Sequence, residues 1–471
     1  MRKTQIRKIE RKLYWYDRKI LGTTFLALLL VFCVTGCQIS SNTSSLGATA
    51  ISIDSYGNAI ISEEDGTEYL GGVVGIPMTD EELYSSKASS VDGTLSDDPY
   101  YNNSSDAASF TDNSSAAFDK NGSNSLSNQS LLENESLTEN EYSFELSEGK
   151  DYATLVFGGD ILFAEGYAIK YKIDQNGNSI EGVIDQSLLD CMRNADICMV
   201  NNEFPYTTEG TPLEDKTWTF HANPSTVKYL FQMGVDIVSI GNNHVFDYGA
   251  IGLSNTLTTL ESVNMPYVGA GSNLEEASKI VYFSSDNGIR IAFISGCDIE
   301  GCDPPYTRGA TDTQSGVFRV RQDELLCERI KEAKETGAFV VVYMHWGLEN
   351  TTELNYLQKQ QSIDLATAGA DLIIGDHPHI LQNLDYVCNV PVIYSMGNYL
   401  FNSKTLDTGL VEAKINPQGL VSWQFIPAIQ SGSTVSMAYG SEKTRILNYL
   451  QSISPNVLID GDGYIVSVAN Q

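Results

Sequence analysis

The stretch that decides the fold is Gly-Val-Asp-Ile-Val-Ser-Ile-Gly-Asn-Asn-His-Val-Phe-Asp-Tyr-Gly at residues 234–249. Its first part, 235–240, is an apolar, β-branched run between glycines, which predicts a short buried strand. Asn242, Asn243 and His244 follow directly, and the apolar spacing then becomes helical. A strand, a polar loop and a helix in this order are typical of α/β sheets, which build their sites beyond the carboxyl ends of their strands.

The same order of strand and polar loop occurs five more times in the chain. Each apolar run stops on side chains that can bind a metal ion or contact a substrate. These endings are Gly158-Gly159-Asp160, Asn201-Asn202-Glu203, His345-Trp346-Gly347, Gly375-Asp376-His377-Pro378-His379 and Gly397-Asn398. The chain has five histidines, and four of them, including His244, occupy such strand ends. We therefore expect one site that is assembled from many strands.

Alternating strands and helices from about residue 153 to about residue 427 predict one α/β domain, to which we assign residues 149–430. Residues 431–471 are expected to form a C-terminal extension with a helix and a short strand. The helices are expected at 184–193, 224–233, 249–263, 323–336, 355–368 and 441–452. The strands are expected at 152–157, 196–200, 235–240, 290–295, 339–344, 372–374, 392–396, 410–415, 420–426 and 464–468.

Residues 1–37 are interpreted as a targeting and anchoring element. A basic leader precedes an apolar run at 20–34, which is short for a membrane span of ~20 residues and is typical of a signal peptide. The run ends in Val34-Thr35-Gly36-Cys37, which resembles a bacterial lipobox, so Cys37 is expected to carry a lipid and become the new N-terminus. The alternative is an uncleaved signal anchor. Both interpretations place the rest of the chain outside the cytoplasmic membrane.

Residues 38–148 are predicted to be a disordered tether. They are rich in Ser, Asn and acidic side chains, and such a composition buries too little apolar surface to offset the entropy of ordering. Residues 41–150 contain 20 Asp or Glu against 3 Lys, so more than half of the net charge of −31 lies here. A flexible chain of about 110 residues spans roughly 50–60 Å. The net acidity also argues against nucleic-acid binding, which needs a basic surface.

The donors at the strand ends are oxygen and imidazole groups without thiolates, a set that suits Mn²⁺, Fe, Zn²⁺ or Mg²⁺. Their number favours two divalent ions about 3.5–4 Å apart that share a carboxylate. The candidate ligands are Asp160, Glu203, Asn243, His345, His377 and His379. A thiolate zinc site is not expected, because no Cys-x-x-Cys pair occurs. Cys297 and Cys302 flank a turn-prone segment, and either a disulfide or two separate thiols fits the sequence.

A second set of polar residues lies beside these candidates and is expected to orient the ligands or to contact the substrate. The set consists of Asn202, Asp247, Glu349, Asp376 and Asn398. A plain structural role remains open for some neighbours: Asp247 as a helix cap, Trp346 as a packing residue and His221 as part of a surface loop.

Seven ordered motifs between about residues 153 and 427 resemble the CapA or PgsA-type capsule proteins, which are associated with poly-γ-glutamate biosynthesis. Their domain belongs to the calcineurin-like metallophosphoesterase superfamily, so the resemblance implies a sandwich of mixed β-sheets flanked by helices. The motifs are Gly-Gly-Asp160, Asn202-Glu203, Asn242-Asn243-His244-Val-Phe-Asp247-Tyr-Gly249, Pro266-Tyr-Val-Gly-Ala-Gly271, His345-Trp-Gly-Leu-Glu349, Gly375-Asp-His-Pro-His-Ile-Leu-Gln382 and Ser395-Met-Gly-Asn398.

The resemblance implies a role for each matching residue. The implied ligands are Asp160 and His379 for the first ion, Glu203 as the bridge, and Asn243, His345 and His377 for the second ion. His244 is implied to be the acid that meets the leaving group. The chain departs from the superfamily at two positions, because Leu162 stands where phosphoesterases usually have His, and the bridging residue is Glu instead of Asp.

These features predict a membrane lipoprotein outside the cytoplasm that acts in capsule biosynthesis as a metal-dependent hydrolase or transferase. Its expected partners are the membrane, the anionic capsule polymer and the synthase complex of that polymer. The alternative is a non-catalytic export or assembly subunit that retains the metallophosphatase fold. An ordinary secreted phosphatase or nucleotidase is disfavoured, because the usual first motif is absent.

Overall fold

The computed structural model describes residues 48–53, 59–63, 68–70, 140–147, 149–299 and 307–470. The predicted signal peptide with Cys37 lies outside these residues, so the lipid anchor remains a prediction. Cys302 lies outside them too, so the structure does not decide between a disulfide and two separate thiols at Cys297 and Cys302. Among the described residues, no helix has the length and apolar character needed to cross a membrane.

Part of the predicted tether forms a small antiparallel sheet. It consists of β1 (Ala48–Ile53), β2 (Ala59–Glu63) and β3 (Glu68–Leu70) in the order β1-β2-β3. Three short segments of the predicted tether therefore pair with one another. Isoleucine recurs in β1 and β2, and β-branched residues favour strand pairing.

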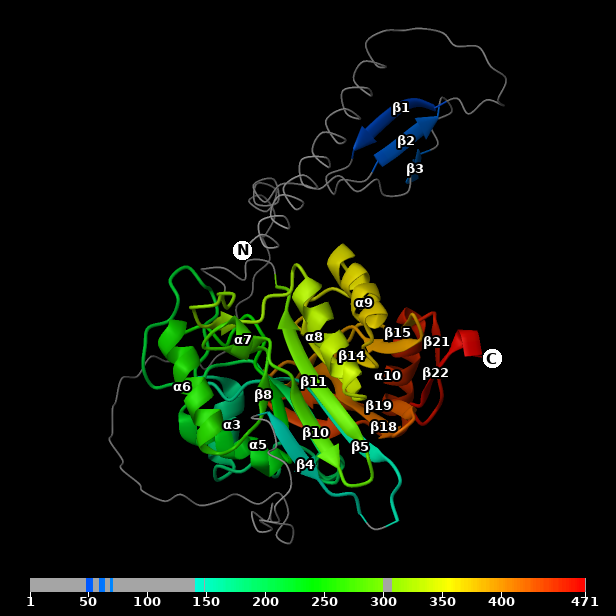
Figure 1. Ribbon diagram of the computed structural model, residues 1–471. Coiled ribbons are helices and arrows are strands. Elements are labelled where there is room, and N and C mark those ends of the chain that lie inside the picture. Colours follow the sequence, from blue (N-terminus) through cyan, green and yellow to red (C-terminus); the bar gives the residue numbers. More distant parts are fainter. Residues whose placement is uncertain are drawn as a thin grey trace, which may run out of the picture. The chain divides into compact units, whose positions relative to one another are not determined.

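Two mixed β-sheets make up the fold from residue 140 onward, as Figure 1 shows. In the seven-stranded sheet, β11, β13, β14 and β16 run parallel. Strand β15 is antiparallel to β16, and β10 is antiparallel to β11 but parallel to β4. The order in this sheet is β15 (Leu384–Val387), β16 (Val390–Ile393), β14 (Leu372–Asp376), β13 (Phe339–His345), β11 (Arg290–Cys297), β10 (Val281–Ser285) and β4 (Glu141–Phe144).

The eight-stranded sheet combines five strands that pair in parallel with an antiparallel hairpin region. The order is β20 (Thr434–Met437), β19 (Gly419–Ser431), β18 (Leu406–Asn416), β5 (Ala153–Ile161), β6 (Ile197–Asn202), β7 (Ile237–Ser239) and β8 (Tyr267–Val268), with β17 (Asn398–Leu400) also paired to β5. Two further pairs are formed by β9 (Ala270–Gly271) with β12 (Gly316–Val317), and by β21 (Val457–Ile459) with β22 (Ile465–Ser467).

Helices cover the outer face of each sheet (Figure 1). The eight-stranded sheet packs against α3 (Ala168–Gln175), α4 (Gln186–Arg193), the 3-10 helix η1 (Pro224–Val227), α5 (Lys228–Met233) and α6 (Gly249–Ser262). The seven-stranded sheet packs against α7 (Leu274–Ala277), α8 (Glu324–Glu335) and α9 (Tyr356–Ala368). The chain continues with α10 (Gly440–Ile453) and η2 (Val468–Asn470).

The alternation of side chains along each strand separates the layers, because successive residues of a strand point to opposite faces. In β5, Leu155 and Phe157 lie in the core between the sheets, whereas Val156 packs on the helix side. In β13, Tyr343 lies in the same central core and Val342 packs under α8 and α9. The layers are helices, sheet, sheet and helices, which confirms the predicted fold class.

The fold begins earlier and ends later than the expected limits of 149 and 430. Strand β4 extends the seven-stranded sheet at its β10 edge, and β20 pairs with β19. Helix α10 buries Ile446 and Leu450 in the core between the sheets. The predicted C-terminal extension is therefore part of the same packed unit.

Candidate metal centre

The candidate ligands converge where the carboxyl ends of both sheets meet. Asp160 lies on β5, Glu203 follows β6 and His345 ends β13. His377 and His379 follow β14. Two groups of ligand atoms result, each with all its atoms within 4.8 Å of one another: Glu203 with His345 and His377, and Asp160 with Glu203 and His379. Glu203 is common to both groups.

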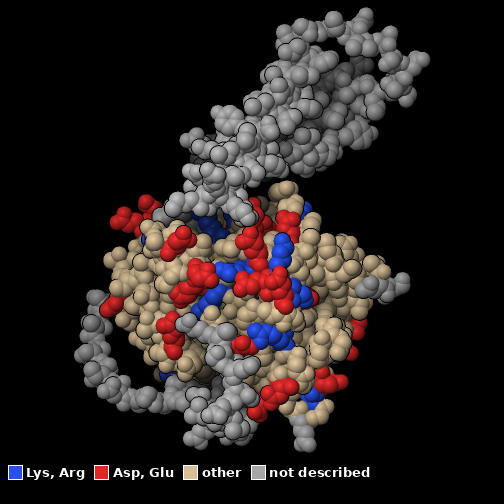
Figure 2. All heavy atoms as spheres, in the orientation of Figure 1, with Lys and Arg blue, Asp and Glu red and all other residues tan. Residues whose placement is uncertain are grey.

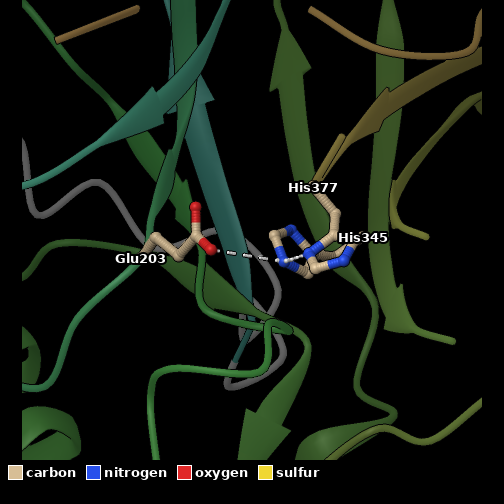
Figure 3. A group of neighbouring side chains, drawn as sticks. All are labelled: Glu203, His345 and His377. Atoms are coloured by element: carbon tan, nitrogen blue, oxygen red, sulfur yellow. Dashed lines mark hydrogen bonds and ion pairs between the residues drawn. The ribbon is translucent and has the colours of Figure 1, made fainter. Parts of the chain in front are cut away.

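Figure 3 shows the carboxylate of Glu203 pointing toward the neighbouring imidazoles of His345 and His377. Its Oε1 lies 3.5 Å from Nε2 of His345 and 4.0 Å from Nε2 of His244. Both carboxylate oxygens are buried, and neither has a hydrogen-bond partner within the described part of the chain. A buried carboxylate without partners is costly unless a cation compensates it.

The amide of Asn243 lies beside the group formed by Glu203, His345 and His377. Its Oδ1 lies 2.8 Å from Nε2 of His345, and Nδ1 of His377 lies 3.2 Å from the same nitrogen. Burial lowers the pKa of His345 to about 3, and burial together with the neighbouring His345 lowers that of His377 well below its usual value. Both imidazoles are therefore neutral at pH 7, and the neutral form is the one that binds a metal.

In the group formed by Asp160, Glu203 and His379, Asp160 accepts a hydrogen bond of 2.7 Å from Nδ2 of Asn201. Its Oδ2 lies 3.2 Å from Nδ1 of His379. The same nitrogen lies 2.8 Å from Oδ1 of Asn398. Burial opposes charge on Asp160, but the contact with His379 outweighs it and lowers the carboxyl pKa. Burial and the charge of Asp160 raise the pKa of Glu203 well above its usual range. A divalent cation between the two carboxylates would relieve this repulsion.

His244 stands beside the two groups and is held by other contacts. Its Nδ1 lies 2.8 Å from Oδ2 of Asp247, and its ring lies 4.2 Å from that of Phe220. Because a carboxylate only accepts hydrogen bonds, Nδ1 carries the proton and Nε2 faces Glu203 without one. Burial lowers the pKa of His244 to about 4. Burial therefore favours the neutral form of this imidazole, and its role as an acid stays a prediction.

Comparison with known proteins identifies the family. Residues 154–403, more than half of the chain, match the model described as "Bacterial capsule synthesis protein PGA_cap". This chain belongs to that family. It is 30% identical over 309 residues to "Capsule biosynthesis protein CapA" of Bacillus anthracis, covering 63% of this chain and 72% of that protein. It is also 30% identical over 281 residues to "PGA biosynthesis protein CapA" of Bacillus subtilis (strain 168), covering 59% of this chain and 71% of that protein.

A more distant relative is the "Probable polyglutamine synthesis accessory protein Rv0574c" of Mycobacterium tuberculosis. It is 22% identical over 281 residues, covering 55% of this chain and 72% of that protein.

Of the second set of predicted residues, Asn398 contacts His379 of a ligand group, whereas Asp247 contacts His244. Asp376 accepts a hydrogen bond from Tyr343, but its Oδ1 is buried without a partner among the described residues. Asn202 donates to the carbonyl of Phe204, and Glu349 is exposed.

Two residues that were left open have structural roles. Trp346 packs on Tyr394 and donates to its carbonyl oxygen. Nδ1 of His221 lies 3.2 Å from the carbonyl oxygen of Thr207, outside both ligand groups.

The structure adds three residues that the sequence did not single out: Asn201, Lys216 and Phe220. Asn201 directly precedes Asn202 at the end of β6, so its place in the chain was a usable signal. Lys216 is almost fully buried and pairs with Asp247, and it also donates to the carbonyl oxygen of Asn243. The loop around Lys216 and Phe220 has no hydrophobic periodicity from which their place near the centre could be predicted.

Leu162 does not reach the centre. It is buried in the apolar cluster between the eight-stranded sheet and its helices, together with Phe163 and Ile169. The imidazole that phosphoesterases usually supply at this position therefore has no equivalent here.

Proposed function

We propose that this protein is a metal-dependent hydrolase or transferase of capsule polymer biosynthesis, and that its substrate class is poly-γ-glutamate. The main support is Glu203, a buried carboxylate without hydrogen-bond partners that is shared by two groups of ligand atoms. The names of the two Bacillus relatives support the link to the capsule and to PGA biosynthesis.

The donor set fits divalent ions such as Mn²⁺, Fe²⁺, Zn²⁺ or Mg²⁺, because it consists of carboxylate, amide and imidazole groups. Asp160 and His379 would hold one ion, His345, His377 and Asn243 the other, and Glu203 both. When bound, such ions supply a hydroxide nucleophile and polarise the bond that is cleaved.

His244 provides proton transfer in this proposal. Asp247 fixes the ring with Nδ1 protonated, so Nε2 would take a proton from the attacking water and give that proton to the leaving group. Lys216 compensates the charge of Asp247 inside the protein. The bond attacked is a phosphoester or an amide such as the γ-glutamyl bond.

The proposal includes the anchor at Cys37, which would hold the catalytic unit near the outer surface of the cytoplasmic membrane. There it would meet the growing polymer and the synthase complex that produces it. Residues 38–139 would connect the lipid to the first strand of the main fold.

A second candidate function is a non-catalytic subunit for polymer export or assembly. The buried position of Leu162 favours it, because the first ion loses one of its usual ligands. The word "accessory" in the name of the mycobacterial relative points in the same direction.

One experiment separates the two functions. The purified full-length chain is analysed for bound metal and screened for turnover of phosphoesters and γ-glutamyl peptides, with and without added Mn²⁺. Metal together with turnover supports the enzyme, and metal without turnover on either class supports the assembly subunit. The absence of any metal uptake would contradict the metal-dependent enzyme and leave the assembly subunit.

A further inference from the structure

We propose that Asn398 is a direct ligand of the first metal ion. It supplies a donor atom that the residue at position 162, a leucine, does not provide. The inference rests on the metal-dependent function proposed above. It assigns the amide oxygen of Asn398 to the group formed by Asp160, Glu203 and His379.

The first observation is the convergence of three donor atoms. Nδ1 of His379 lies 2.8 Å from Oδ1 of Asn398 and 3.2 Å from Oδ2 of Asp160. A single proton on Nδ1 cannot point at both oxygens with good geometry. Ligands at about 2.1 Å from an octahedral ion are separated by about 3.0 Å along each edge. The two distances bracket this edge, as expected for three ligands around one ion.

The second observation is that the backbone positions the amide of Asn398 beside Asp160. Strand β17 runs parallel to β5, and Asn398 is the register partner of Asp160. A Cβ on Gly159 would lie 2.0 Å from the carbonyl oxygen of Gly397, so a side chain there would push β17 away. Gly397 has a φ of +65°, which favours glycine, and its N–H donates to Oγ of Ser395.

The third observation is the shortage of ligands on the first ion. Asp160, Glu203 and His379 supply three groups, while divalent ions of this class take at least four ligands. Leu162 contributes none, because it packs in the apolar cluster. Asn398 is 1% exposed, and amide oxygen is a suitable donor for Mn²⁺ and Mg²⁺.

The test measures Mn²⁺ binding to the full-length chain and does not depend on turnover. We expect the wild type to bind two Mn²⁺ per chain by calorimetry and elemental analysis. Asn398→Leu keeps a similar volume but lacks the oxygen, so it should bind one ion tightly and the other at least tenfold more weakly. Asn398→Asp keeps an oxygen and should bind two. Asn416→Leu is the control, because it makes the same replacement in a turn outside both ligand groups, and it should still bind two.

Anomalous diffraction from Mn²⁺-loaded wild-type crystals gives the direct result, and it remains decisive if Asn398→Leu does not fold. A manganese peak at about 2.0–2.4 Å from Oδ1 of Asn398 supports the proposal. A peak more than 3 Å away, or wild-type affinity for both ions in Asn398→Leu, overturns it and leaves the metal-dependent function intact. A wild type that binds both ions but turns over no substrate would instead refute the hydrolase and leave the role of Asn398 standing.

Discussion

Replacing Glu203 by glutamine should have opposite effects on stability in the absence and in the presence of metal. The carboxylate is fully buried, and both of its oxygens lack hydrogen-bond partners among the described residues. Burial and the charge of Asp160 raise its pKa in the folded state. Glutamine has nearly the same shape and carries no charge, so Glu203→Gln isolates the electrostatic contribution.

The sign of the metal-free effect follows from proton linkage. Below the pKa that Glu203 has in the unfolded chain, its side chain is protonated in both the folded and the unfolded state. It therefore does not change the free energy of unfolding in that pH range. Above that pKa, the unfolded chain ionises first, so the free energy of unfolding falls as the pH rises toward the folded pKa, by about 1.4 kcal/mol for each unit by which the pKa is raised. With a chelator at pH 8, Glu203→Gln should therefore be more stable than the wild type. At pH 4 the two should be equally stable.

Bound metal should reverse this difference in stability between Glu203→Gln and the wild type. A ligand at 100 times its Kd stabilises the folded state by about 2.7 kcal/mol, or roughly 4 °C in Tm for a domain of about 330 residues. The wild type should show this rise in Mn²⁺. Glu203→Gln should show less than half of it, because the residue shared by both ligand groups has lost its charge.

The assay is thermal unfolding followed by circular dichroism at pH 4 and pH 8, each with a chelator and at pH 8 also with Mn²⁺. The control is Glu328→Gln at an exposed position on α8. It should change neither the stability in chelator nor the gain in stability from Mn²⁺. The reasoning is refuted if Glu203→Gln gains as much as the wild type from Mn²⁺, or if it is the less stable protein in chelator at pH 8.

Three further predictions concern catalysis, anchoring and domain limits. His244→Ala should keep the metal content of the wild type and lose turnover by ~10²–10⁴-fold, with a smaller loss for leaving groups that need no protonation; loss of metal would make His244 a ligand. Cys37→Ala should leave an unprocessed precursor without lipid label, whereas an intact Met1 on the wild-type membrane protein would establish the signal anchor. Limited proteolysis should cut between residues 71 and 139, where the composition is Ser- and Asn-rich, and leave a resistant fragment that begins near Asn140; a stable product that retains 71–139 would contradict this.

The sequence predicted the ligand groups because their chemistry coincides with strand ends. Apolar runs such as 339–344 stop abruptly on polar residues, and parallel strands bring such endings to one edge of a sheet. Asp160, Glu203 and His345 were therefore found from local pattern alone. The pairing of the two sheets, which brings His345 within 3.5 Å of Glu203, depends on tertiary packing and came from the resemblance to the family.

Other features could not be predicted, because they depend on contacts between distant segments. Lys216 belongs to a mostly exposed loop without periodicity, and its burial follows from its pairing with Asp247. The low pKa of His244 arises from burial, which a residue type does not reveal. Strand β4 lies in a polar segment, and only pairing with β10 makes it part of the sheet.

Bound metal would also resolve the conflict between an acidic protein and an anionic polymer. The net charge is −31, and on the face shown in Figure 2 acidic and basic side chains are interspersed around α8. Such a face offers a polyanion little net attraction. At the centre, Asp160 and Glu203 bring two negative charges, while two divalent ions would bring four positive ones, so the site becomes locally cationic when it is loaded. We therefore expect polymer binding to require metal, and binding of poly-γ-glutamate by the chelated protein at wild-type affinity would show that another surface holds the polymer.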